Sequence, residues 1–167
     1  MNNTFVISDT HFGHANIIEY CNRPFETVEE MDSYMINQWN KTVKDNDIVI
    51  HLGDFAFGTG EEIRKYASQL NGKKILVQGN HDRKGIGFFE SCGFTVWKKG
   101  SLLPIIKNGL IYDYILSHAP LDNIEVPEGY INCFGHIHNS LLQEKYNKDN
   151  HMCVSVELVD YTPLKIN

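Results

Sequence analysis

Short apolar runs alternate with amphipathic stretches along the first half of the chain. The runs at Thr4–Ser8, Ile48–Leu52 and Lys74–Gln78 have the length and composition of buried strands. Each run is followed by small or polar residues, which is typical of a strand that ends in a loop. The pattern therefore predicts strand, helix, strand, helix and strand in that order.

Two capping boxes mark the helices between these strands. Thr27 with Glu30, and Thr59 with Glu62, have the spacing at which side chains satisfy the free amide groups of a helix N-terminus. After the first box, apolar residues recur at helical spacing and predict one buried face, formed by Val28, Met31, Met35, Trp39 and Val43. We interpret this face as part of the core.

The second half of the chain has a different pattern. Asn71-Gly72 ends the second helix, and a short helix is expected around Gly87–Cys92. Strand then follows strand, at Thr95–Lys98, Leu102–Lys107, Leu110–Ser117, Tyr130–Phe134 and Cys153–Leu158, with a hairpin turn at Asn108-Gly109. We expect a layered α/β fold in which two sheets pack face to face, with helices outside.

Composition and charge narrow the class of protein. The 167 residues, 42% hydrophobic and 22% charged, fit one domain over residues 1–167. The formal net charge of −6 argues against general attraction to nucleic acid or anionic membrane. The chain lacks a signal-peptide pattern and a run of transmembrane length, and its four cysteines are scattered without CxxC pairing. We therefore expect a cytoplasmic protein with free thiols.

Metal-competent side chains follow five of the predicted strands. Ligands in α/β sheets bind beyond the carboxyl ends of the strands, so these side chains should meet at one edge. They are Asp9-x-His11, Gly53-Asp54, Gly79-Asn80-His81-Asp82, His118, and Gly135-His136-x-His138. Each group alone is more often a turn, a cap or a hydrogen-bonded structural histidine. Five together favour a functional site.

The residue types indicate catalytic metal ions. Imidazole suits Zn, Fe, Ni or Co, and carboxylate or amide oxygens suit Mn or Mg. A mixed set without thiolates is typical of a catalytic centre, in contrast to a structural zinc site. In centres with two ions, the ions lie about 3.5–4 Å apart and share a bridging carboxylate. Asp9 and Asp54 are the two aspartates available for this bridge. Such a centre would remain positive and attract a phosphate.

In order and content, these groups resemble the motifs of the calcineurin-like metallophosphoesterases. The resemblance covers residues 9–138 and implies a four-layer α/β/β/α sandwich with two divalent ions, among which we favour Mn over Fe, Zn, Ni or Co. It implies that one ion binds Asp9, His11, Asp54 and His138, and the other Asp54, Asn80, His118 and His136. Asp54 would be the bridge. A metal-bridging hydroxide would attack phosphorus directly. His81 would protonate the leaving oxygen or stabilise charge there, and Asp82 would orient His81.

Departures from the family pattern bear on the subclass. Protein Ser/Thr phosphatases of this family have Asp-Arg-Gly after the second motif and Glu after Asn-His, whereas Phe55 and Asp82 stand here. The chain looks like the small, uncapped bacterial and phage-type members. Candidate contacts to a small phosphorylated substrate are His14, Asn16, Arg23 and Arg83, each of which is equally expected as a solvated loop residue. His51 and His151 are expected to be structural.

Three functions remain open at this point. The first is hydrolysis of phosphomonoesters or phosphodiesters. The second is a non-catalytic scaffold on the same fold; such proteins typically lose the histidine that His81 provides here. The third is a nuclease-type phosphodiesterase, which the acidic composition disfavours, although metals could hold one phosphodiester group. The sequence leaves the native substrate, the metal and the oligomeric state open.

Overall fold

The computed structural model describes residues 2–107, 110–146 and 148–167. The first of its two sheets contains the strands β1 (Thr4–Ile7), β2 (Ile48–His51), β3 (Lys73–Val77), β4 (Phe94–Trp97) and β9 (Leu164–Lys165). Their order is β4-β3-β2-β1-β9, and only β9 pairs antiparallel. The three strands predicted in the first half, β1, β2 and β3, are therefore parallel neighbours.

The second sheet contains β5 (Ser101–Lys107), β6 (Leu110–Leu116), β7 (Tyr130–Phe134) and β8 (His151–Cys153), in that order. β5 pairs antiparallel with β6, whereas β6, β7 and β8 are parallel. The turn predicted at Asn108-Gly109 lies outside the described residues.

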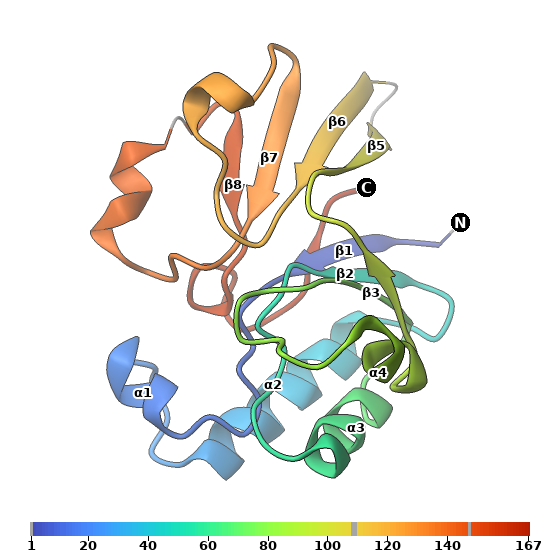
Figure 1. Cartoon of the computed structure of the whole chain (residues 1–167), viewed down its shortest axis with the longest axis vertical. Coiled ribbons are helices and arrows are strands. Elements are labelled where there is room, and N and C mark those ends of the chain that lie inside the picture. Colours follow the sequence, from blue (N-terminus) through green and yellow to red (C-terminus); the bar gives the residue numbers. More distant parts are fainter. Residues whose placement is uncertain (1, 108–109, 147) are drawn as a thin grey trace.

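Four α-helices occur in the described chain: α1 (Asn16–Tyr20), α2 (Val28–Thr42), α3 (Gly60–Ser68) and α4 (Ile86–Ser91). Helices α2, α3 and α4 lie on the outer side of the first sheet, and the second sheet stacks on its other side (Figure 1). The second sheet is accompanied by short 3-10 helices, η1 (Asn123–Glu125) and η2 (Leu141–Lys145). The α/β fold with two mixed sheets and flanking helices is confirmed.

Side chains of the first sheet alternate between two cores. Phe5, Ile7 and Val49 pack in the cluster shared with α2 and α3. Val6 and Ile50 pack instead against the second sheet. This alternation follows from the pleat of a strand. Because both faces are covered, the strands contain the unbroken apolar runs seen in the sequence.

Both predicted helix starts are found, although only one is a complete capping box. Thr59 accepts the amide of Glu62, and the Glu62 side chain accepts the amide of Thr59. Thr27 likewise accepts the amide of Glu30, but the Glu30 carboxylate accepts the amide of Glu26. The expected apolar face of α2 is largely buried.

The strand predicted at Cys153–Leu158 is wrong. β8 ends at Cys153, and a 3-10 helix, η3, spans Val156–Leu158. Here the chain crosses between sheets, because the Val154 amide donates to Phe134 of the second sheet and the Val156 amide donates to Ser8 beside the first. Hydrophobicity alone did not distinguish this crossing from a strand. Helix α1 and strand β9 were also not predicted.

Candidate metal centre

The carboxyl ends of β1, β2, β3, β6 and β7 converge on one edge where the two sheets meet. The side chains expected there each follow one of these strands: Asp9 and His11 after β1, Asp54 after β2, Asn80 and His81 after β3, His118 after β6, and His136 and His138 after β7. Backbone hydrogen bonds hold the loops together. The Asp9 amide donates to Gly53 and the Gly135 amide donates to His118.

The backbone of these loops is unusual. Five of the eight described non-glycine residues with positive φ are candidate ligands: Asp9 (58°), His11 (50°), Asp54 (56°), His136 (70°) and His138 (49°). Non-glycine residues rarely adopt this left-handed region, and such strain concentrates at functional sites.

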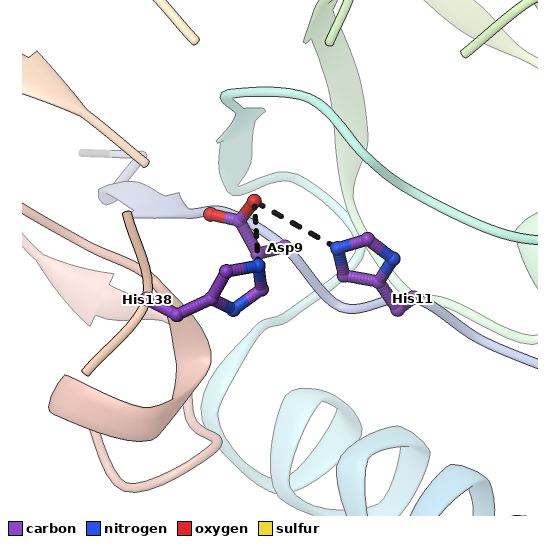
Figure 2. A group of neighbouring side chains, drawn as sticks. All are labelled: Asp9, His11 and His138. Carbon is purple, nitrogen blue, oxygen red and sulfur yellow. Dashed lines mark ion pairs between the residues drawn. The ribbon is translucent and has the colours of Figure 1, made fainter. Parts of the chain in front are cut away.

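The first group of ligand-type side chains consists of Asp9, His11 and His138 (Figure 2). The Nε2 atoms of His11 and His138 lie 3.9 and 3.8 Å from Oδ1 of Asp9. That Oδ1 atom and both ring nitrogens of His11 are buried without a hydrogen-bond partner in the described structure. Buried polar atoms are rarely left unpaired, and a cation coordinated at this point would satisfy Oδ1 of Asp9 and Nε2 of His11.

The second group consists of Asp54, His118 and His136, with the Asn80 side chain beside it. Nε2 of His118 lies 3.4 Å from Oδ2 of Asp54 and 3.0 Å from Oδ1 of Asn80. Nδ1 of His118 lies 2.8 Å from the carbonyl oxygen of Leu52, which can only accept. The ring therefore donates from Nδ1 and directs Nε2 toward the site, as metal-binding histidines usually do.

Asp54 connects the two groups. Its Oδ2 lies 3.7 Å from Nε2 of His11 in the first group and 3.4 Å from Nε2 of His118 in the second. Its Oδ1 accepts the backbone amide of His81 at 2.8 Å. One oxygen is thus fixed by the protein, and the other lies between the two histidines.

Burial and neighbouring charges shift the pKa values in the metal-free protein. Burial lowers the pKa of His11 to about 2, so this ring is neutral and suited to bind a metal. Burial raises the pKa of Asp9. Burial also acts to raise the pKa of Asp54, but the hydrogen bond and charge of His118 outweigh it and lower that pKa to about 2.

Glu157 is a residue that sequence reasoning missed. Its Oε1 lies 3.0 Å from Nδ1 of His138, which directs Nε2 of that ring toward Asp9. The pKa of His138 would be lowered by burial, but hydrogen bonds to Cys21 and Glu157 raise it to about 10. An acidic residue within the apolar stretch Val154–Leu158 was the signal available in the sequence.

Arg23 holds the loop after β1 and Glu157 in place. It is only 4% exposed, and its guanidinium pairs with Glu157 at 2.7 Å. It also donates to the carbonyl oxygens of Asp9 at 2.7 Å and Thr10 at 3.0 Å. Since these contacts occupy the guanidinium inside the fold, we do not retain Arg23 as a substrate contact.

Asp82 is bound to the backbone. Its carboxylate accepts the amides of Gly79 and Asp54 at 2.8 Å each, and of Phe55 at 3.0 Å. These bonds fasten the loop after β3 to the loop after β2. We therefore assign Asp82 to loop positioning, and we do not retain the expectation that it orients the His81 ring.

Two glycines allow the loops to approach the aspartates. A Cβ atom on Gly79 would lie 2.2 Å from Oδ1 of Asp54, and one on Gly135 would lie 2.2 Å from Oδ2 of Asp9. Real Cβ atoms essentially never come this close. Glycine is thus required by the space around each carboxylate.

His81 and His14 border the centre without belonging to either group. The His81 ring is 36% exposed, with Nε2 4.0 Å from Oδ2 of Asp54. His14 stacks on Phe57, with ring centroids 4.0 Å apart, and lies 5.6 Å from the His11 ring. Phe57 in turn lies 5.1 Å from the His81 ring.

The remaining expected residues lie farther out. Arg83 is exposed and lines a hollow next to His81. Asn16 begins α1 and lines a different hollow, together with Glu26 and Glu29. His51 and His151 are buried; Nε2 of His51 lies 2.9 Å from the Thr10 hydroxyl, and Nε2 of His151 lies 3.0 Å from the Leu121 carbonyl oxygen.

The stacked mixed sheets and their shared edge of His, Asp and Asn side chains define a metallophosphoesterase type of fold. Residues 3–153 match the family model of the calcineurin-like phosphoesterases, and the chain belongs to this family. The family typically binds divalent metal ions, and the described residues include candidate ligands for them.

Related proteins match this chain over its full length. An uncharacterised protein of Methanocaldococcus jannaschii is 37% identical over 173 residues, covering all of this chain and 89% of that protein. The crystal structure of a protein of unknown function from Aquifex aeolicus has a TM-score of 0.68 and 26% identity, covering 99% of this chain and 96% of that one. An archaeal phosphodiesterase shares the fold, with a TM-score of 0.50, 16% identity, and 92% and 82% of the two chains covered.

Helices of the described chain are each too short or too polar to cross a lipid bilayer. Its cysteines, Cys21, Cys92, Cys133 and Cys153, are free thiols.

Proposed function

We propose that this protein is a dinuclear metal-dependent phosphoesterase, which hydrolyses phosphomonoester or phosphodiester bonds by direct attack of water on phosphorus. One observation carries the proposal. Oδ2 of Asp54 lies within 3.7 Å of one ring nitrogen from each of two separate ligand groups. A carboxylate oxygen between two such groups is the arrangement that a bridged metal pair requires.

The donor set fits two divalent ions. One would be held by Asp9, His11, His138 and Asp54, and the other by Asp54, Asn80, His118 and His136. The unpaired buried Oδ1 of Asp9 and the unpaired Nε2 of His11 support the first assignment. Neutral imidazoles with a few carboxylates suit first-row transition metals, and we favour Mn²⁺ because two carboxylates and an amide oxygen contribute.

The charge balance favours a phosphate substrate. Two divalent ions would bring four positive charges, of which Asp9 and Asp54 cancel two, whereas the His and Asn ligands cancel none. When bound, the ions would make water a stronger nucleophile and draw charge from the phosphoryl oxygens. The centre would thus attract an anion to a protein whose net charge is −6.

His81 would act on the leaving group. It belongs to neither ligand group, yet its half-exposed ring lies against Asp54 and a hollow in the surface. Its amide donates to Asp54, which fixes the backbone, while the ring remains directed to the site. A ring so placed can donate a proton to the oxygen that departs from phosphorus.

A non-catalytic metal-binding scaffold is the alternative on the same fold. A scaffold needs no proton donor beside the metals, and the position of His81 therefore favours an enzyme. Turnover separates the two functions, because a scaffold would bind metal without hydrolysing any ester.

The test is a combined measurement of metal content and hydrolysis. We expect about two ions per chain after loading with Mn²⁺, and turnover of p-nitrophenyl phosphate, bis-p-nitrophenyl phosphate or cyclic nucleotides. Asp54→Asn should lose both metal and turnover, since a neutral amide bridges two cations poorly. A wild-type protein without bound metal or Mn²⁺-dependent activity would rule out the proposal. An Asp54→Asn variant with both properties intact would remove Asp54 from the bridge.

A further inference from the structure

A hollow of about 380 Å³ adjoins His81 on the side of the first sheet. Its walls combine aromatic and aliphatic side chains with two cations. The lining includes Phe57, Ile63, Phe89, His81, Arg83 and Lys84. Because His81 lines this hollow, the hollow is within reach of a group that takes a proton from His81.

The two cations are held at the rim by the fold. Arg83 and Lys84 are exposed, and Nζ of Lys84 lies 5.8 Å from the centre of the Phe88 ring. The Gln78 side chain donates to the carbonyl oxygens of Asp82 and Lys84 at 3.1 and 2.9 Å, which fixes the backbone that carries both cations. The rim is thus positive although the whole chain is acidic.

Carboxylates near this rim are already engaged. Asp82 accepts three backbone amides, as described above. Glu62, whose carboxylate lies close to Gly58 in the lining, accepts from the amide and hydroxyl of Thr59. The cations of the rim are therefore available to an incoming anion.

A second hollow, of about 510 Å³, adjoins His136 in the second ligand group. It is lined by Ala119, Pro120, His136, Ile137, Ser140, Leu142 and Tyr146, all from the second half of the chain. These described lining residues include neither Lys nor Arg. The Lys145 ammonium lies 5.6 Å from the centre of the Tyr146 ring, but it pairs with the Asp122 carboxylate at 3.8 Å. The metal centre consequently has a hollow lined by two cations on the side of His81, and a hollow whose described lining carries no cation on the side of His136.

From this asymmetry we propose that the substrate is a phosphodiester with two organic arms, whose leaving arm carries a ring and a second negative charge, as a nucleotide unit does. The proposal rests on the proposed function and specifies its substrate class. The ring of the leaving arm would pack on Phe57, and its second phosphate would meet Arg83 and Lys84. The other arm would occupy the hollow at Tyr146.

The reaction is a hydrolysis that needs no further reactant. The oxygen of water forms a bond to phosphorus, and the bond from phosphorus to the leaving oxygen breaks. The leaving oxygen takes a proton, from His81, to become a hydroxyl group. Of the two water protons, one restores the protonated His81 and the other is released to solvent. The products are a phosphomonoester and an alcohol that bears the second phosphate.

Three dinucleotides test the asymmetry: thymidylyl-thymidine, the same compound with a terminal 5′-phosphate, and the same with a terminal 3′-phosphate. Product analysis of each cleavage shows which nucleoside keeps the central phosphate and hence which arm leaves. We expect kcat/KM of the Mn²⁺-loaded protein to be about tenfold higher when the terminal phosphate is on the leaving arm, the effect of one charge-assisted hydrogen bond. A phosphate on the other arm should have little effect.

Substitutions at the rim should abolish this preference. In the double variant Arg83→Gln with Lys84→Gln we expect the ratio of kcat/KM values to fall to about one, because both cations that meet the second phosphate are gone. Lys41→Gln, at the end of α2, removes an exposed cation far along the chain from the hollow and should keep the wild-type ratio.

Several outcomes would overturn the substrate assignment while leaving the phosphoesterase intact. They are equal rates for the three dinucleotides, an equal gain from a phosphate on either arm, a preference that survives in the double variant, or no dinucleotide cleavage by a protein that hydrolyses bis-p-nitrophenyl phosphate. If that simple diester and p-nitrophenyl phosphate are both inert and no metal binds, the proposed function itself fails.

Discussion

Gly135→Ala tests whether close packing around Asp9 sets the affinity of the candidate centre for metal. An alanine Cβ at this position would lie 2.0 Å from the Ser8 hydroxyl oxygen and 2.2 Å from Oδ2 of Asp9. Normal contact begins near 3.4 Å, so these atoms must separate by more than about 1 Å, and overpacking of this kind costs about 1–3 kcal/mol.

The carboxylate of Asp9 cannot move that far and keep its partners. Oδ2 accepts the His136 amide at 2.9 Å and the Ser155 hydroxyl at 2.8 Å, and the residue is fully buried. Metal–ligand distances tolerate only about 0.2 Å. We therefore expect Gly135→Ala to weaken Mn²⁺ binding about 10–100-fold, the size of effect seen when supports of metal ligands are removed.

Calorimetric titration of the metal-free protein with Mn²⁺ measures this change directly. Thermal unfolding with and without Mn²⁺ provides a second reading, because the shift that metal produces depends on its affinity. The matched control is Gly87→Ala in α4, where an added Cβ meets nothing within 4 Å. It should bind Mn²⁺ like the wild type. A folded Gly135→Ala protein that binds Mn²⁺ within about twofold of the wild type would refute the reasoning.

Three further predictions concern residues around the centre. His81→Ala should keep its metal and lose about 10²–10⁴-fold in kcat for alkyl phosphates, but less for p-nitrophenyl esters, whose leaving group departs without a proton; loss of metal would make His81 a ligand. Glu157→Gln should weaken Mn²⁺ binding about 10–100-fold, because His138 loses its anionic partner; unchanged titration curves would contradict this role. Burial lowers the pKa of His51 from 6.5 to about 3, so the unfolded chain takes up a proton below pH 6.5 that the folded one does not. The stability due to a neutral His51 should be present above pH 6.5 and fall by about 2 kcal/mol at pH 5. Urea unfolding of the metal-free protein measures the free energy of unfolding at each pH, and this energy should fall less steeply with decreasing pH in His51→Gln than in the wild type. Parallel pH dependences of the two proteins would contradict the assignment.

The sequence predicted those helices and strands whose bounds depend on interactions between residues close together in the chain. Apolar runs specified the strands β1, β2 and β3 to within a residue or two, because burial on both sheet faces demands unbroken hydrophobicity. The capping box at Thr59 fixed the start of α3, because its hydrogen bonds join residues three apart. Segments without such signals, such as α1 and β9, were not predicted.

The family of the chain was also contained in its sequence. Motif residues follow directly after strands, and parallel strands end at the same edge of a sheet, so their order alone indicates a shared site. The motifs alone therefore indicate the candidate ligands. The order of the strands did not divide these residues into two groups; that division came only from the resemblance to the family, because it depends on which loop of the second sheet lies over which loop of the first.

Tertiary structure alone decided the surroundings of the candidate ligands. Glu157 contacts His138 because the chain crosses between sheets after β8, a crossing that resembled a strand in the sequence. Arg23, expected as a substrate contact or a solvated loop residue, is buried, and its guanidinium donates to the Asp9 carbonyl oxygen and to Glu157, 134 residues away. The sequence by itself determined the ligand types and the strands that carry them, because both are set by residues close together in the chain. Packing determined the partners of those ligands and the spaces beside them, because these contacts join residues that are far apart in the sequence.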